Sequence, residues 1–229
     1  IEHARRLIAE GRAEEAMDVP LGPEIGQCCG GRVTVTLRYA DDVVRREVMA
    51  RVMAEDGSAA SVYVFGAGHV GRVLAQILSL LPVKVEVIDT RQEELDRLPP
   101  GIPHRRVAMP EAVVRSAPVG SAYVILTHDH ALDFLIANEA LGRADCPYVG
   151  MVGSRTKRAK FASWYMEQGG DRVDLDRLIL PIGAQGLGDK RPSVIAALAA
   201  AEIMVHIGAR EVSVGQVSTP KRLGVTSGF

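Results

Sequence analysis

The chain has 229 residues, of which 47% are hydrophobic and 24% are charged, and its formal net charge is −1. This composition is that of an ordinary globular protein, and the balanced charge gives no electrostatic argument for binding nucleic acid or a membrane surface. The longest apolar runs, such as residues 194–205, are too short to span a bilayer, and no signal peptide opens the chain. Three cysteines, an odd number, argue against a secreted disulfide scaffold, so we expect a cytoplasmic protein.

The start of the chain predicts a small α+β segment. Apolar residues at helical spacing over residues 2–17 predict a helix already under way at the first residue, and therefore an N-terminally truncated segment. Alternating β-branched and polar residues predict a strand at 33–39, whereas residues 41–57 fit either a strand or a helix. The small, polar stretch at 54–60 is the predicted boundary, which gives an N-terminal segment of residues 1–56.

Two adjacent cysteines, Cys28 and Cys29, lie in the glycine-rich stretch of residues 22–31 within this segment. Neighbouring residues rarely close a disulfide without strain. The pair therefore either packs, or presents thiols to a soft partner such as a metal, a sulfur atom or a dithiolene.

Residues 57–209 have a different sequence pattern, in which short apolar runs alternate with segments of helical spacing. Strands are predicted at residues 61–65, 83–89, 103–109, 121–127 and 147–153. Helices are predicted at residues 69–81, 132–143, 154–170 and 190–208. Such alternation predicts an α/β fold with a Rossmann-like, doubly wound parallel sheet covered on both faces, followed by a C-terminal tail at residues 210–229.

A GxGxxG turn at Gly66, Gly68 and Gly71, with His69 inside it, joins the first strand of this region to its helix. The three glycines permit a tight turn, close approach of the backbone to a phosphate, and close packing of helix on strand. Asp89 ends the next strand, where dinucleotide-binding folds place the acidic residue that binds a ribose. The turn indicates the fold; a bound dinucleotide and a fold without one both remain open.

A loop after the predicted strand 121–127 carries His128, His130 and Asp133. Because ligands bind beyond the carboxyl ends of parallel strands, at least one histidine is expected to contact a ligand. Two histidines at this spacing could also hold a metal or move protons. The alternative is structural, with Asp129 capping the next helix and the imidazoles making ordinary hydrogen bonds.

A second loop, after the predicted strand 147–153, places Ser154 where it can cap a helix. Arg155 and Lys157 follow at the positive end of that helix, where cations are disfavoured. They predict a bound anion, most simply a phosphate, or else form a solvated basic face.

Taken in order, these segments resemble one known family. They read IGQCCGG, FGAGHVG, DTR, LTHDHALD, VGMVGSRTKRAKF and PIGAQGLGDKRPSVIAALAAAEI. The chain is similar in them to the xanthine dehydrogenase accessory protein family (XdhC/CoxI), over about residues 1–205.

The resemblance implies a cytoplasmic helper protein rather than an enzyme. Such a protein binds the molybdenum cofactor (molybdopterin) as cargo, protects it during sulfuration and delivers it to a molybdenum hydroxylase such as xanthine dehydrogenase. The implied partners are that hydroxylase and a cysteine desulfurase, and the apolar last helix leads us to expect a homodimer. The alternative is an oxidoreductase that uses NAD(P) or FAD on the glycine turn, with one of the loop histidines as acid–base.

The resemblance also assigns a cofactor site. Cys28 and Cys29 would meet the molybdenum, and the pterin phosphate would lie on the glycine turn or against Arg155 and Lys157. The cofactor-binding residues are expected to be Cys28, Cys29, Gly66, Gly68, His69, Gly71, Asp89, His128, His130, Asp133, Ser154, Arg155 and Lys157.

Overall fold

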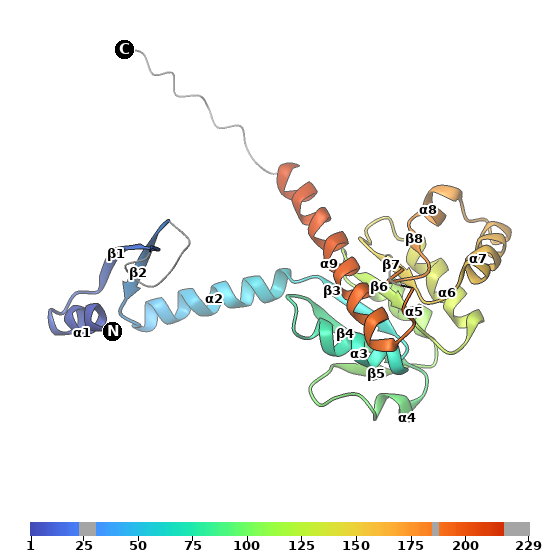
Figure 1. Cartoon of the computed structure of the whole chain (residues 1–229), viewed down its shortest axis with the longest axis horizontal. Helices are drawn as coiled ribbons and strands as arrows, with labels where there is room; N and C mark the ends of the chain where they lie inside the picture. Colours follow the sequence, from blue (N-terminus) through green and yellow to red (C-terminus); the bar gives the residue numbers. More distant parts are fainter. Residues whose placement is uncertain (23–30, 185–187, 218–229) are drawn as a thin grey trace, which may run out of the picture. The chain divides into compact units, whose positions relative to one another are not determined.

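The computed structural model describes residues 1–22, 31–184 and 188–217. The chain divides after Ser58 into two compact units (Figure 1). The elements of the N-terminal unit are α1 (Glu2–Ala9), β1 (Glu14–Pro20), β2 (Arg32–Arg38) and α2 (Asp42–Ser58). The strands β1 and β2 pair in antiparallel register, with Met17 opposite Val35. The strand predicted at 33–39 is confirmed, and the segment that fitted either a strand or a helix is helical.

The predicted helix over residues 2–17 is wrong in its second half. The helix α1 ends before Gly11, which turns the chain with φ +62°. The N–H groups of Gly11 and Arg12 donate to the carbonyls of Ile8 and Leu7, which is the hydrogen-bond pattern of a Schellman C-cap. The strand β1 comes next, and its side chains alternate in exposure because they belong to a hairpin with β2.

The second unit contains a six-stranded sheet in which every described pairing is parallel. Its strands are β3 (Ser61–Phe65), β4 (Lys84–Asp89), β5 (His104–Arg106), β6 (Ala122–Ile125), β7 (Val149–Met151) and β8 (Leu178–Ile179). The strand order is β5-β4-β3-β6-β7-β8, so the direction of winding reverses between β3 and β6. This is the strand order of the Rossmann fold, and the predicted fold class and its five strands are confirmed.

Helices connect the strands of this sheet. They are α3 (His69–Leu78), α4 (Gln92–Leu95), α5 (Pro110–Ser116), α6 (His130–Leu141), α7 (Arg155–Glu167), α8 (Arg172–Asp176) and α9 (Pro192–Val217). The four predicted helices of this region are present. The short helices α4, α5 and α8 and the edge strand β8 are absent from the prediction, because elements of so few residues show no periodicity of their own.

Two hydrophobic cores lie on the two faces of the sheet. Alternate strand residues such as Val64 and Val124 belong to one core, together with side chains of α3 and α9. Their neighbours Phe65 and Ile125 belong to the other, together with side chains of α5, α6 and α7. The helices lie on both faces accordingly (Figure 1). Burial on both faces explains why these strands are continuous apolar runs.

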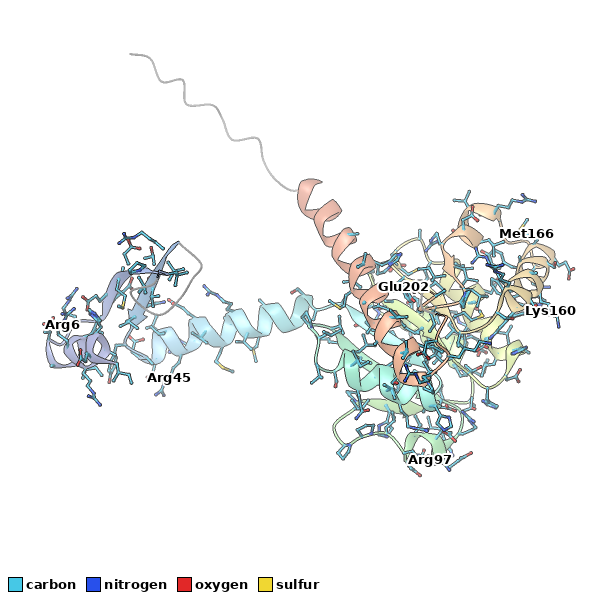
Figure 2. The ribbon with its side chains drawn as sticks, viewed as in Figure 1. Arg6, Arg45, Arg97, Lys160, Met166 and Glu202 are labelled. Carbon is cyan, nitrogen blue, oxygen red and sulfur yellow. The ribbon has the colours of Figure 1, made fainter. Side chains whose placement is uncertain are left out.

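The helix α9 is longer than the apolar run that predicts it. Its window Pro192–Ala209 has a mean hydropathy of 1.6, and it is the one helix in the described part of the chain long and apolar enough to cross a membrane. Ala199 and Ile203 of this window are buried in the core, and a core helix has the same composition as a span. Glu202 (labelled in Figure 2) is buried and accepts a 2.6 Å hydrogen bond from the Tyr148 hydroxyl. Burial and this hydrogen bond raise the pKa of Tyr148.

Candidate functional site

The expected site residues of the second unit gather at the carboxyl edge of the sheet, around the reversal between β3 and β6. The turn after β3 contains Gly66, the connection from β6 into the start of α6 contains Thr127 to His130, and the turn after β7 contains Ser154. Because β3 pairs with β6 and β6 pairs with β7, these three connections are neighbours in space. Open α/β sheets bind their ligands at such a reversal.

The glycine turn has the geometry that its spacing predicts. Gly66 has φ +115°, and a Cβ on it would lie 2.4 Å from the carbonyl oxygen of Leu126. A Cβ on Gly71 would lie 1.9 Å from the carbonyl oxygen of Gly66, so the first turn of α3 packs directly on the loop. Gly68 precedes α3, and nothing lies within 4 Å of the position that its Cβ would take. Two glycines therefore serve packing, and the third leaves backbone open to a ligand.

Asp89 anchors this turn from the end of β4. Its carboxylate accepts four hydrogen bonds, which come from the N–H groups of Ala67 and Arg91 and from two nitrogens of the Arg91 guanidinium, at 2.8–3.0 Å. The carboxylate is almost fully buried, and burial alone would raise its pKa. The hydrogen bonds from Arg91 and Ala67 outweigh this effect, so the pKa of Asp89 is lowered. Asp89 therefore stays ionised, and both of its carboxylate oxygens accept hydrogen bonds from the protein itself.

The loop between β6 and α6 is organised by two aspartates. Asp129 caps α6, accepting a 2.8 Å hydrogen bond from the N–H of Ala131, as the structural alternative predicts. Asp133 is fully buried, and its Oδ1 accepts hydrogen bonds from the N–H and the hydroxyl of Thr127, at 3.0 and 2.7 Å. His128 and His130 lie on either side of Asp129, and both are exposed.

Lys157 does not crowd the start of α7 in the way that the sequence suggests. Its ammonium turns inward, forms an ion pair with Asp133 and donates a 2.9 Å hydrogen bond to the carbonyl of Val152. Gly153 makes this path possible, because a Cβ there would lie 2.7 Å from Cδ of Lys157. Ser154 caps α7 as predicted, accepting from the N–H of Lys157. The buried pair therefore joins the loop after β6 to the turn after β7.

With Lys157 paired, Arg155 is the other cation that the sequence places at the start of α7. It is exposed at the first position of α7, and no ion pair of its guanidinium is found among the residues that the structure describes. A cation beside the positive end of a helix dipole is unfavourable unless an anion lies near it. Of the two cations that the sequence places at this helix start, Arg155 alone is exposed there, as either a bound anion or a solvated basic face would require.

A cavity of about 280 Å³ lies between these two loops. Its lining residues are Thr127, His128, His130, Val152, Gly153, Ser154 and Lys157. The structure thus brings together both histidines, Ser154 and Lys157 in one cavity wall, with Asp133 beneath them. Sequence reasoning did not identify Thr127 and Gly153 as residues of this cavity. For Gly153, the signal available in the sequence is its place directly before the helix-capping Ser154.

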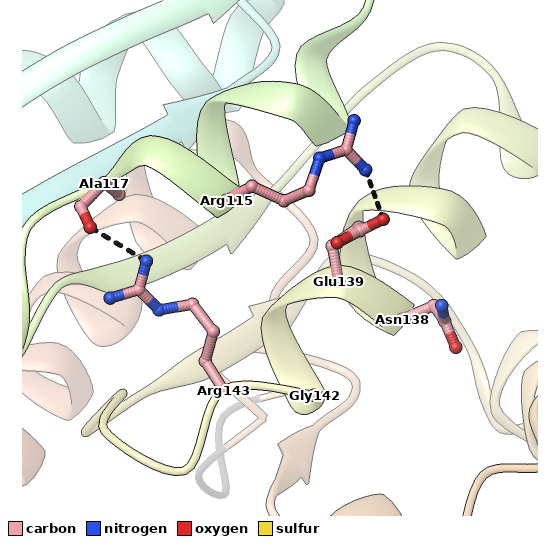
Figure 3. A pocket seen from close by; sticks show the side chains of 6 residues that line it. All are labelled: Arg115, Ala117, Asn138, Glu139, Gly142 and Arg143. Atoms are coloured by element: carbon pink, nitrogen blue, oxygen red, sulfur yellow. Dashed lines mark hydrogen bonds and ion pairs between the residues drawn. The ribbon is translucent and has the colours of Figure 1, made fainter.

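A larger cavity, of about 570 Å³, lies at the opposite edge of the sheet, where α5 and α6 end (Figure 3). Its arginines are occupied. Arg115 forms an ion pair with Glu139, and Arg143 donates to backbone carbonyls at the end of α5, including that of Ala117 at 2.8 Å. Arg143 also binds Asp145 and lowers its pKa to about 2. We assign a structural role to the residues of this cavity, since Arg143 caps the end of α5 and Arg115 is paired with Glu139.

The cysteine pair and His69 are also expected to contact the cofactor. Cys28 and Cys29, the expected contacts to molybdenum, lie outside the described residues. Within residues 1–22, 31–184 and 188–217, no group of three or more His, Cys, Asp or Glu side chains is arranged to hold a metal ion. His69 is exposed at the first position of α3, next to the open Gly68.

Comparison with known proteins identifies the fold and the family. The chain is similar to a crystal structure described as a xanthine dehydrogenase from Bacillus halodurans, with a TM-score of 0.75 and 17% identity, over 96% of this chain and 81% of that one. At this identity the likeness shows the fold alone. No curated protein matches the sequence. Residues 62–203, more than half of the chain, match the model of the XdhC Rossmann domain, and the chain therefore belongs to the XdhC family.

Proposed function

We propose that this protein binds the molybdenum cofactor at the carboxyl edge of its six-stranded sheet, protects the cofactor during sulfuration, and delivers it to a molybdenum hydroxylase related to xanthine dehydrogenase. Membership of the XdhC family supports the accessory role. The hydroxylase, a cysteine desulfurase and a second copy of this chain are the proposed partners. The cofactor is cargo in this scheme and leaves with the hydroxylase.

One observation carries the placement of the cargo. The cavity of about 280 Å³ is lined by His128, His130 and Ser154 and adjoins the start of α7, where Arg155 has no ion-pair partner within the described residues. Two imidazoles, a hydroxyl and free N–H groups are polar groups that suit a hydrogen-bonding pterin. The guanidinium and the helix N-terminus suit its phosphate. Most of these groups are donors, as an anionic ligand requires.

The buried pair beneath the cavity fits the same role. Lys157 and Asp133 neutralise one another and hold the two loops in a fixed relation, so that the cavity is formed before a ligand arrives. A preformed site loses less conformational entropy on binding than a mobile one. Lys157 is therefore a positioning residue in this proposal, and Arg155 is the phosphate contact.

The thiols of Cys28 and Cys29 are proposed to meet the molybdenum or the sulfur handled at it, because thiolates are soft ligands. Their variants test this assignment. We expect Cys28→Ala and Cys29→Ala to lower the affinity for the cofactor without unfolding the protein. Unchanged affinity in both single variants and in the double variant would remove the thiols from the mechanism.

The central experiment is a transfer assay. The protein is incubated with molybdenum cofactor, separated from free cofactor, and mixed with cofactor-free xanthine dehydrogenase. We expect hydroxylase activity to return faster than with the same amount of free cofactor. Return at the same rate, or no retention of cofactor by the protein, would refute the proposal.

Arg155→Ala tests the phosphate contact in the same assay. We expect it to weaken cofactor binding by about tenfold, with a smaller loss at high salt because screening weakens an exposed charge interaction. Lys160→Ala is the matched control, because Lys160 is an exposed cation on the same helix (Figure 2). Equal losses in both variants would mean a general charge effect, and a loss independent of salt would mean that Arg155 acts through packing.

A further inference from the structure

In this Rossmann fold, the side chain of Arg91 lies on the carboxylate at which a nucleotide's ribose would bind. In dinucleotide-binding folds, the acidic residue at the end of the second strand accepts hydrogen bonds from a ribose diol. Here that residue is Asp89, and its neighbour Arg91 already lies on it. A carboxylate has about four lone-pair positions. Ala67 and Arg91 fill them with four hydrogen bonds of 2.8–3.0 Å.

We propose that Arg91 is a specificity-determining residue, which closes the ribose subsite of the glycine turn so that this fold rejects NAD and NADP while the turn itself stays open to a phosphate. The inference concerns the nucleotide subsite alone and holds whether or not the molybdenum cofactor is the cargo.

The four hydrogen bonds to the Asp89 carboxylate come from two kinds of donor, backbone and side chain. This explains why Arg91, rather than Asp89, determines whether a ribose can bind. Two of the four come from backbone N–H groups, those of Ala67 and Arg91, and remain in any side-chain variant. The other two come from Nε and Nη2 of the guanidinium, each at 3.0 Å. Removing the side chain frees two acceptor positions, which is the number that a vicinal diol fills.

The surroundings hold Arg91 in place. Its side chain is 29% exposed and Asp89's is 3% exposed, so the pair is largely shielded from competing water. A ribose would have to displace a two-pronged, charge-assisted contact and leave both charges unpaired in its place. The turn beyond the pair is unaffected, because Gly68 has open space beside it.

The test is direct binding of NAD and NADP to the full chain by calorimetry. We expect wild type to bind neither with a Kd below about 1 mM, and Arg91→Ala to bind NAD at least about tenfold more tightly. Arg97→Ala is the control, since Arg97 is exposed after α4 and pairs with Glu94 rather than Asp89 (Figure 2). Arg91→Gln, which keeps most of the side-chain length, replaces Arg91→Ala if the latter does not fold.

Three outcomes would overturn the proposal. Tight binding of NAD or NADP by wild type would show that the pair opens readily. Absence of any gain in the folded Arg91 variant would show that another feature closes the subsite. A gain that persists when Asp89→Asn is added would show that the nucleotide binds away from this carboxylate, whereas loss of the gain supports the assignment.

Discussion

Replacing Lys157 with methionine tests whether the buried pair with Asp133 organises the candidate site. Methionine keeps the apolar stem of the lysine and removes the ammonium. Asp133 is then left fully buried without its counter-charge, retaining only the two hydrogen bonds from Thr127. The carbonyl of Val152 also loses its donor.

The expected cost follows from the burial of the pair. Lys157 is 7% exposed and Asp133 is 0% exposed, so solvent cannot replace the lost partner. Removing one partner of a buried ion pair costs about 3–5 kcal/mol. The remaining Thr127 hydrogen bonds place the cost near the lower end of this range, at about 3 kcal/mol. For a domain of this size that corresponds to a decrease in Tm of roughly 6–12 °C.

The assay can be restricted to the unit that contains the pair. Trp164 is the single tryptophan of the chain, and it lies in α7 against Phe134 and Phe161. Urea unfolding monitored by its fluorescence therefore reports on this unit. Lys160→Met is the matched control, since it removes an exposed lysine of the same helix and should change the free energy of unfolding by no more than about 0.5 kcal/mol.

Two results would refute the reasoning. The first is a loss in Lys157→Met no greater than in Lys160→Met. The second concerns the variant that combines Asp133→Asn with Lys157→Met, which removes both charges and should lose less than the sum of the single losses. A loss equal to the sum would show that the two residues contribute independently.

Two further predictions rest on local geometry. Gly71→Ala should cost about 3 kcal/mol or more in free energy of unfolding, because its Cβ would lie 1.9 Å from a backbone oxygen, whereas Gly68→Ala faces open space and should cost less than about 1 kcal/mol. Equal costs in urea unfolding would contradict the packing role. Asp145→Asn should lower the free energy of unfolding by about 1–2 kcal/mol at pH 7. The hydrogen bond from Arg143 lowers the pKa of this carboxyl to about 2, so the ionised carboxylate stabilises the folded state at pH values above the ordinary pKa of an aspartate. That stabilisation is lost as the pH falls through about 2, so the difference from wild type should be less than half as large at pH 2.5; an unchanged difference would mean that the charge of Asp145 does not contribute.

Local pattern in the sequence predicts most of the second unit. Burial of a strand on both faces requires continuous apolar residues, and the runs at 61–65 and 121–127 therefore predict strands without knowledge of their partners. The glycine turn is also local, because Gly66 and Gly71 pack against each other within one connection. Such features depend on a few consecutive residues, so periodicity and spacing reveal them.

The N-terminal unit shows where that reasoning fails. Residues 14–17 continue the helical spacing of α1, yet they form the start of β1. Gly11 ends the helix, and pairing with β2 makes the next residues a strand. Hydrogen bonds to a distant strand outweigh a helical pattern of a few residues, because helix propensity differs by only a fraction of a kcal/mol per residue.

The approximate places of the candidate site residues in the second unit could be predicted from the sequence, because the carboxyl ends of parallel strands share one edge. Their partners could not. Lys157 pairs with Asp133 only because the helices α6 and α7, which are separate in the sequence, start side by side at that edge. The strand order brings the two helix starts together, and it results from packing across the whole sheet. Arg91 is close to Asp89 in the sequence, but which group its guanidinium binds is seen only in the structure. The sequence by itself therefore determined the elements and the edge at which the candidate site lies. The tertiary structure decided which charged groups neutralise one another and which, like Arg155, have no ion-pair partner among the described residues.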